Sequence, residues 1–148
     1  MQELARGWKE DPETLPLLKD RIHPDENPAV REAAVQELAR GWKEDPETLP
    51  LLKDRARSDK EWIVREAAVR ELARGWKEDP DILPLLKDRA RSDKSEFVRQ
   101  AAVQELARGW KEEPETLDLL KDRARSDEDP SVRQAAVREL ERGWGTSV

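Results

Sequence analysis

Few side chains in this chain are placed to carry out chemistry. His23 is the single histidine, and a histidine acts as a general base only within reach of a group whose proton it removes. No serine nucleophile lies near it in a recognisable motif. The chain has no cysteine, which excludes disulfides and zinc sites built on thiolates. We therefore interpret His23 as a residue of a solvated loop between helices.

Neither the clustered acidic residues nor the glycines indicate a metal-binding or phosphate-binding site. Glu44-Asp45 and the run Asp127–Asp129 lack the alternating aspartates and the glycine of a calcium loop, and the capping of helix N-termini accounts for them. Each repeated glycine stands alone before a tryptophan, so no phosphate-binding loop is present. We expect no enzymatic activity, no cofactor and no metal.

Composition excludes two classes of partner. Among 148 residues, 28 are Lys or Arg and 34 are Asp or Glu, which gives a formal net charge of −6. The two signs alternate closely, whereas nucleic-acid binding requires clustered cations. No apolar run approaches the roughly 20 residues that span a membrane, and the start, MQELARGW, lacks the apolar core of a signal peptide. We expect a cytoplasmic protein without nucleic-acid or membrane partners.

The chain is an internal repeat. Gly-Trp pairs recur every 34 residues, and Gly41–Arg74 and Gly75–Arg108 are identical at 27 of 34 positions. A fixed period of this size predicts a stacked array of supersecondary units. We predict a single solenoid over 1–148, with a partial leading helix over 1–8 and a tail over 145–148. The repeat units are expected at about 9–42, 43–76, 77–110 and 111–144.

Each unit contains two helix signals. Asp45-Pro46 predicts an N-cap followed by proline at the first helical position, and a first helix of about 12 residues. The second helix, of about 15 residues, is predicted to start after a cap such as Asn27, Ser95 or Asp129. It buries a stripe that ends at Trp42, so we expect the repeated tryptophans in the core. A helix pair cannot bury its apolar faces alone, so the predicted fold is all-α, a stack of antiparallel pairs.

The sequence of the repeat resembles that of a known family. A first helix ending LLKDRA, then an aspartate, then VRxAAVxELA is similar to HEAT or HEAT-like repeats, and the resemblance implies an α-solenoid. It also implies a ladder of aspartates and arginines along the stack. The matching positions are Asp25, Asp59, Asp93, Asp127, Arg31, Arg65, Arg99 and Arg133.

The residues themselves support such a ladder. Arg31 projects into the apolar arc of Val30, Ala34 and Leu38, and a charge there needs a partner because an unpaired buried ion is costly. The partner is either Asp25 or its equivalent in the neighbouring unit. The 34-residue period also equals that of tetratricopeptide repeats, which is the alternative fold. That family places Trp and Tyr inside its first helix, however, and this chain has no tyrosine.

The wording GWKxDPxTLxLLKxRA is also similar to arrays appended to large signalling NTPases, notably in cyanobacteria. Those arrays act as sensor or partner-binding modules. The resemblance implies a non-enzymatic scaffold that binds a protein or peptide. A consensus-designed array with no ligand would have the same wording and is the alternative.

Differences between the units indicate where a partner binds. They concentrate at the register positions of residues 28, 29, 32 and 36, which lie mostly on one face of the second helix, away from its apolar stripe. The HEAT resemblance places this face on the inner, concave surface. The candidate partner-binding residues are Trp62, Ile63, Glu66, Arg70, Glu96, Phe97, Gln100 and Gln104. The alternative is neutral variation on a solvated face, with Ile63 and Phe97 filling gaps between units.

The two ends lead to expectations about assembly. The chain opens with the tail of a second helix and closes before the next DPET segment, so we expect an excerpt from a longer array. Glu141 replaces the alanine of earlier units and makes one terminal face more polar, as in capping units. Nothing comparable protects the other end, so we expect weak head-to-tail self-association.

Overall fold

The computed structural model describes residues 12–23 and 26–145, and all regular structure in these ranges is helical. The described chain forms two compact units that divide between Gly75 and Trp76. Unit 1 holds α2 (Thr14–Arg21), α3 (Pro28–Gly41), α4 (Thr48–Ser58) and α5 (Trp62–Gly75). Unit 2 holds α6 (Ile82–Ser92), α7 (Glu96–Gly109), α8 (Pro114–Ser126) and α9 (Pro130–Trp144). The predicted leading helix over 1–8 lies outside the described residues.

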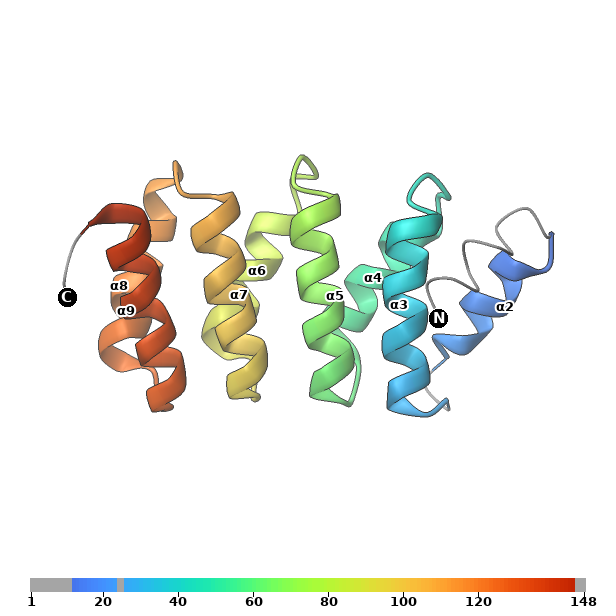
Figure 1. Cartoon of the computed structure of the whole chain (residues 1–148), viewed down its shortest axis with the longest axis horizontal. Coiled ribbons are helices and arrows are strands. Elements are labelled where there is room, and N and C mark those ends of the chain that lie inside the picture. Colours follow the sequence, from blue (N-terminus) through green and yellow to red (C-terminus); the bar gives the residue numbers. More distant parts are fainter. Residues whose placement is uncertain (1–11, 24–25, 146–148) are drawn as a thin grey trace. The chain divides into compact units, whose positions relative to one another are not determined.

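Each unit consists of two helix pairs that stack through their second helices. In unit 1, α3 packs along α5, while α2 covers α3 and α4 covers α5 (Figure 1). Unit 2 repeats the arrangement, with α7 along α9, α6 on α7 and α8 on α9 (Figure 1). The prediction of an all-α, α-solenoid fold built from stacked helix pairs is confirmed.

The core of each pair is aliphatic. Leucines and valines of both helices, such as Leu38, Leu52 and Leu72, are fully buried, and small residues such as Ala34 and Ala68 allow the second helices to approach closely. The tryptophans are less buried than predicted. Trp110 is 8% exposed, but the other described repeat tryptophans are only half-buried.

Two of these tryptophans follow the last helical glycine and leave helical geometry in the same way. The backbone angles are φ −132° and ψ 41° at Trp42 and φ −129° and ψ 37° at Trp110, although only the second of these two is buried. The backbone at the helix end therefore does not by itself determine how exposed the indole is. In unit 2 the ammonium group of a lysine covers these rings: Lys77 lies 5.8 Å from the centroid of Trp110, and Lys111 lies 5.7 Å from that of Trp144.

The caps of the second helices follow the prediction. The side chain of Asn27 accepts a hydrogen bond from the Ala29 N–H at 2.8 Å. Ser95 and Asp129 cap α7 and α9 in the same way. These bonds satisfy amide groups that the first helical turn leaves without a partner.

The predicted start of the first helix, at the proline of the acid-proline pair, was wrong for three pairs. Helix α2 begins at Thr14 and not at Pro12. In α4 the helix begins at Thr48 and not at Pro46, because Asp45 forms a turn in which its carboxylate accepts the Glu47 N–H at 2.9 Å. Asp79 forms the same turn before α6. In the last repeat this position is Glu113, and α8 begins at Pro114, as predicted for an acid-proline pair. The longer glutamate side chain does not form this turn, so the helix starts earlier.

The turn also determines the environment of a buried threonine. The Thr48 hydroxyl donates a hydrogen bond of 2.7 Å to the Trp42 carbonyl, which ties the start of α4 to the end of α3. Thr116 occupies the same register in α8 and is fully buried. Its hydroxyl has no hydrogen-bond partner among the described residues.

These two threonines should therefore respond differently to the same isosteric change. Thr48→Val removes one hydrogen bond and should lower the free energy of unfolding by about 1 kcal/mol. Thr116→Val removes a buried hydroxyl without a partner and should be neutral or stabilising. Urea unfolding of both variants tests this, and equal losses for the two would contradict the assignment.

The repeated glycine and the terminal glycine should also differ. Gly109 is the last residue of α7, and an added methyl group would meet only the Lys77 Cε at 4.0 Å. We expect Gly109→Ala to raise the free energy of unfolding by about 0.5–1 kcal/mol, since alanine loses less backbone entropy on folding. Gly145, the control, has φ +60°, and Gly145→Ala should cost about 1 kcal/mol. Thermal unfolding measures both, and a loss at Gly109 would overturn the expectation.

Candidate protein-interaction surface

A buried ion pair joins the two helix pairs of unit 1. Arg31 donates through Nε to Asp59 Oδ2 at 2.9 Å and through Nη2 to Asp59 Oδ1 at 3.0 Å. The side chains of both residues are at most 1% exposed. Of the two partners that the sequence left open for Arg31, the structure places the aspartate of the following pair against it. Asp25 lies outside the described residues.

The same geometry recurs in unit 2. Arg99 donates through Nε to Asp127 at 3.0 Å and through Nη2 at 3.2 Å. Its third donor, Nη1, binds the backbone carbonyl of Asp93 at 2.7 Å, directly before its own helix. Arg65 and Arg133 bind the equivalent carbonyls of Asp59 and Asp127. Each such arginine is thereby oriented by its own loop.

The aspartates of the ladder are satisfied on several sides. Burial alone would raise the pKa of Asp59, but hydrogen bonds from Arg31 and from the Glu61 N–H, together with the charges of Arg31 and Arg55, hold that pKa below its ordinary value. Arg55 lies in the preceding helix of the same pair and donates to Asp59 at 3.2 Å. The carboxylate thus connects three helices.

A second charged contact between neighbouring pairs was missed by the sequence analysis. Glu71 in α5 is buried and accepts a hydrogen bond of 2.8 Å from Arg40 in α3. In unit 2, Glu139 accepts from Arg108 at 3.4 Å and from Arg142 at 3.2 Å. A signal existed, because these glutamates follow the buried alanine of the VRxAAVxELA motif by three residues and therefore lie on its apolar face.

The candidate partner-binding residues of unit 1 lie at the start and along one face of α5. Trp62 is 39% exposed, and Ile63, Glu66 and Arg70 are half-buried. Arg70 and Glu66 form an ion pair at 3.5 Å. The matching face of α3 carries Glu32. Burial, and then the charge of Glu66, raise the pKa of Glu32 above its ordinary value.

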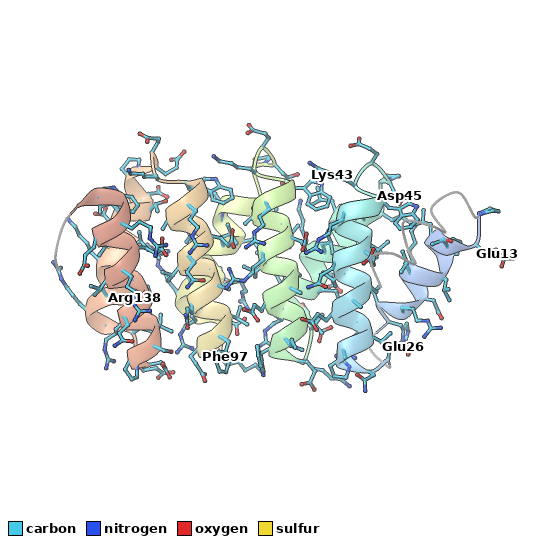
Figure 2. The ribbon with its side chains drawn as sticks, in the orientation of Figure 1. Glu13, Glu26, Lys43, Asp45, Phe97 and Arg138 are labelled. Atoms are coloured by element: carbon cyan, nitrogen blue, oxygen red, sulfur yellow. The ribbon has the colours of Figure 1, made fainter. Side chains whose placement is uncertain are left out.

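The candidate residues of unit 2 occupy the same register on α7. Phe97 is 47% exposed and lies at the first turn of the helix (Figure 2). Glu96, Gln100 and Gln104 are half-buried. On the neighbouring α9, Arg138 is exposed and projects from the side opposite α8 (Figure 2). We refer to the faces of α3 and α5, and of α7 and α9, that carry these residues as the variable stripe of each unit.

The described part of the chain has neither a metal-binding cluster nor a helix that could span a membrane. Residues 12–23 and 26–145 contain no group of three or more histidine, cysteine, aspartate or glutamate side chains arranged to hold a metal ion. Among the helices in these ranges, none has the length and apolar content needed to cross a membrane.

A comparison with protein families identifies the repeat. The family model for HEAT repeats matches residues 2–73 and 61–141, which together span nearly the whole chain. The chain belongs to the HEAT-repeat family. This match favours the HEAT architecture over the tetratricopeptide alternative, and HEAT repeats are generally protein-interaction scaffolds. Neither curated proteins nor solved structures gave a match to the sequence.

The buried ion pair predicts a pH-dependent loss of stability. Asp59→Asn leaves the Arg31 charge buried without its counter-ion and should lower the free energy of unfolding by about 3–5 kcal/mol near neutral pH. The pKa of Asp59 is lowered by folding, so its contribution is present above the ordinary value of 3.8 and is lost as the pH falls below it. The difference in the free energy of unfolding between the unsubstituted chain and the variant should therefore become smaller in acid.

Urea unfolding at neutral pH and again below 3.8 measures this difference. Asp54→Asn is the matched control, because Asp54 is exposed and pairs with Arg55 only at the surface. The control should change stability by less than about 1 kcal/mol. A difference between Asp59→Asn and the natural chain that persists undiminished in acid would contradict the proposed role of the carboxylate.

Proposed function

We propose that this HEAT-repeat chain is a non-enzymatic interaction module that binds a protein or peptide through the variable stripe. The observation that carries the proposal is the exposure of two large apolar side chains, Trp62 and Phe97, at the same end of their respective second helices. Their neighbours on the packing faces are repeated almost unchanged along the chain. Side chains that vary and are exposed are available for recognition, and aromatic anchors often dominate binding energy.

The charge of the stripe in unit 1 favours a basic partner. Glu32 and Glu66 lie on adjacent helices and repel each other, which contributes to the raised pKa of Glu32. A lysine or arginine side chain placed between them would relieve this repulsion. Trp62 precedes Glu66 by one helical turn, so the two side chains share one face of α5. The indole ring can then receive the aliphatic stem or the charge of the same basic side chain.

The stripe in unit 2 has a different character. Gln100, Gln104 and Gln134 offer amide donors and acceptors, Arg138 adds a positive charge, and Glu96 adds a negative one. Next to Phe97, these groups suit an apolar side chain flanked by backbone or acidic groups of the partner. We therefore expect the two units to recognise different parts of one ligand or two different ligands.

Selection of binding peptides from a random-sequence library, followed by affinity measurements with variants, tests this function. Trp62→Ala and Phe97→Ala together should lower the affinity of the chain for the selected peptides by about tenfold or more. Peptides that depend on Trp62 should be enriched in lysine or arginine. Glu66→Gln should also lower the affinity for these peptides, whereas it should leave the affinity for peptides that depend on Phe97 unchanged.

Leu17→Ala is the matched control. Leu17 is another exposed large apolar residue, at 40%, but it lies on the first helix α2 and outside the stripe. The control should leave the affinities unchanged. Peptides that bind all variants equally, or that respond only to Leu17→Ala, would show that recognition occurs elsewhere and would remove the proposal.

A further inference from the structure

The last second helix has a face on which no described residue packs. Six side chains of α9 line a shallow groove of about 530 Å³: Pro130, Arg133, Gln134, Val137, Arg138 and Glu141. The corresponding faces of α3 and α7 carry the next second helix of their unit. In those helices the valine and the arginine of this face are buried: Val35 and Arg31 in α3, and Val103 and Arg99 in α7. In α9, Val137 and Arg133 are only half-buried.

Arg133 has the same orientation as the arginines of the ladder. Its Nη1 donates to the Asp127 carbonyl at 2.6 Å, as the Nη1 of Arg99 does to the carbonyl of Asp93. In Arg31 and Arg99, the Nε and Nη2 edge then binds a carboxylate from the following helix pair. Arg133 therefore presents a preorganised, planar donor edge of the kind that binds a carboxylate with two hydrogen bonds.

Glu141 distinguishes this face from its equivalents. The same register position is Ala39 in α3 and Ala107 in α7, and both alanines are buried. Glu141 is exposed. A further helix pair stacked in the manner of α9 on α7 would bury this carboxylate at a position where the repeat has an alanine, which is unfavourable unless a cation is supplied to it. The face is thus poorly suited to head-to-tail stacking, although it carries an apolar centre.

We propose that this face pairs with the same face of a second copy of the chain, with the two α9 helices antiparallel about Val137. Arg133 precedes Val137 by four residues and Glu141 follows it by four, so all three lie on one side of the helix. A two-fold axis at Val137 brings Arg133 of each copy to the level of Glu141 of the other. The face is then complementary to itself in charge, as an isologous interface requires.

The interface should be weak. With about six side chains from each copy, it falls below the roughly 1,200 Å² that stable complexes bury, and the net charge of −6 on each copy opposes association at low ionic strength. We therefore expect a monomer–dimer equilibrium that becomes visible only at protein concentrations between about 10 µM and 1 mM.

Sedimentation equilibrium of the full chain over this range, at physiological salt, tests the proposal. The natural chain should approach a dimer and no larger species. Glu141→Lys places two cations opposite each other at both symmetry-related contacts and should raise the dissociation constant by about tenfold or more. Adding Arg133→Glu to this variant reverses both charges and should restore association, provided that circular dichroism shows the fold to be intact. Glu112→Lys, an equal charge change at an exposed residue outside the groove, should have no effect.

Glu141→Ala separates this arrangement from head-to-tail stacking. It removes both ion pairs of the antiparallel dimer and should weaken association. In head-to-tail stacking it would instead recreate the alanine surface of α3 and α7, strengthen association and produce species larger than dimers. That result would overturn the proposal. A natural chain that stays monomeric up to about 1 mM, or an association that Glu141→Lys leaves unchanged, would overturn it as well.

Discussion

A guanidinium group buried between two helix pairs is the constraint on which each unit depends. Arg31 is inaccessible to solvent and binds the carboxylate of Asp59 in the following pair. This ion pair therefore forms when the two helix pairs stack on each other. Such a pair adds little net stability compared with well-packed apolar side chains. Its effect is specificity, because any other register between the pairs would separate Arg31 from Asp59 and leave both charges buried.

This constraint explains which residues repeat and which vary. The arginines, aspartates and buried glutamates that link neighbouring pairs must recur with the period of the chain, since each interior pair meets the same neighbours. Residues turned away from these contacts, such as Trp62 and Phe97, are under no such restriction. The structure therefore separates a repeated packing surface from a variable surface, and the proposed binding of a partner uses the variable surface.

Much of the architecture could be predicted from the sequence, because the 34-residue period and the caps at Asn27, Ser95 and Asp129 are local signals. The start of α4 could not be predicted, since Asp45-Pro46 fits both a helix cap and a turn before the helix. Only the hydrogen bond from the Glu47 N–H to the Asp45 carboxylate distinguishes the turn from the cap. Glu71 was missed because its cationic partner, Arg40, lies in the neighbouring helix pair and cannot be identified from the spacing within one helix. The partner of Arg31 remained open, because both candidate aspartates have suitable spacing. For the candidate partner-binding residues, the sequence could identify a variable face but not the exposure of each side chain.

The separation in sequence between paired residues has a kinetic consequence. Arg31 and Asp59 lie 28 residues apart, and Arg40 and Glu71 lie 31 apart. Every link between neighbouring pairs in a unit thus closes a short loop, and no described contact within a unit requires distant parts of the chain to meet first. Chains with such local contact patterns fold quickly. Their folding can begin at any repeat and spread to the neighbouring repeats. The same locality means that a destabilising substitution in one pair acts mainly through the contacts of that pair with its neighbours.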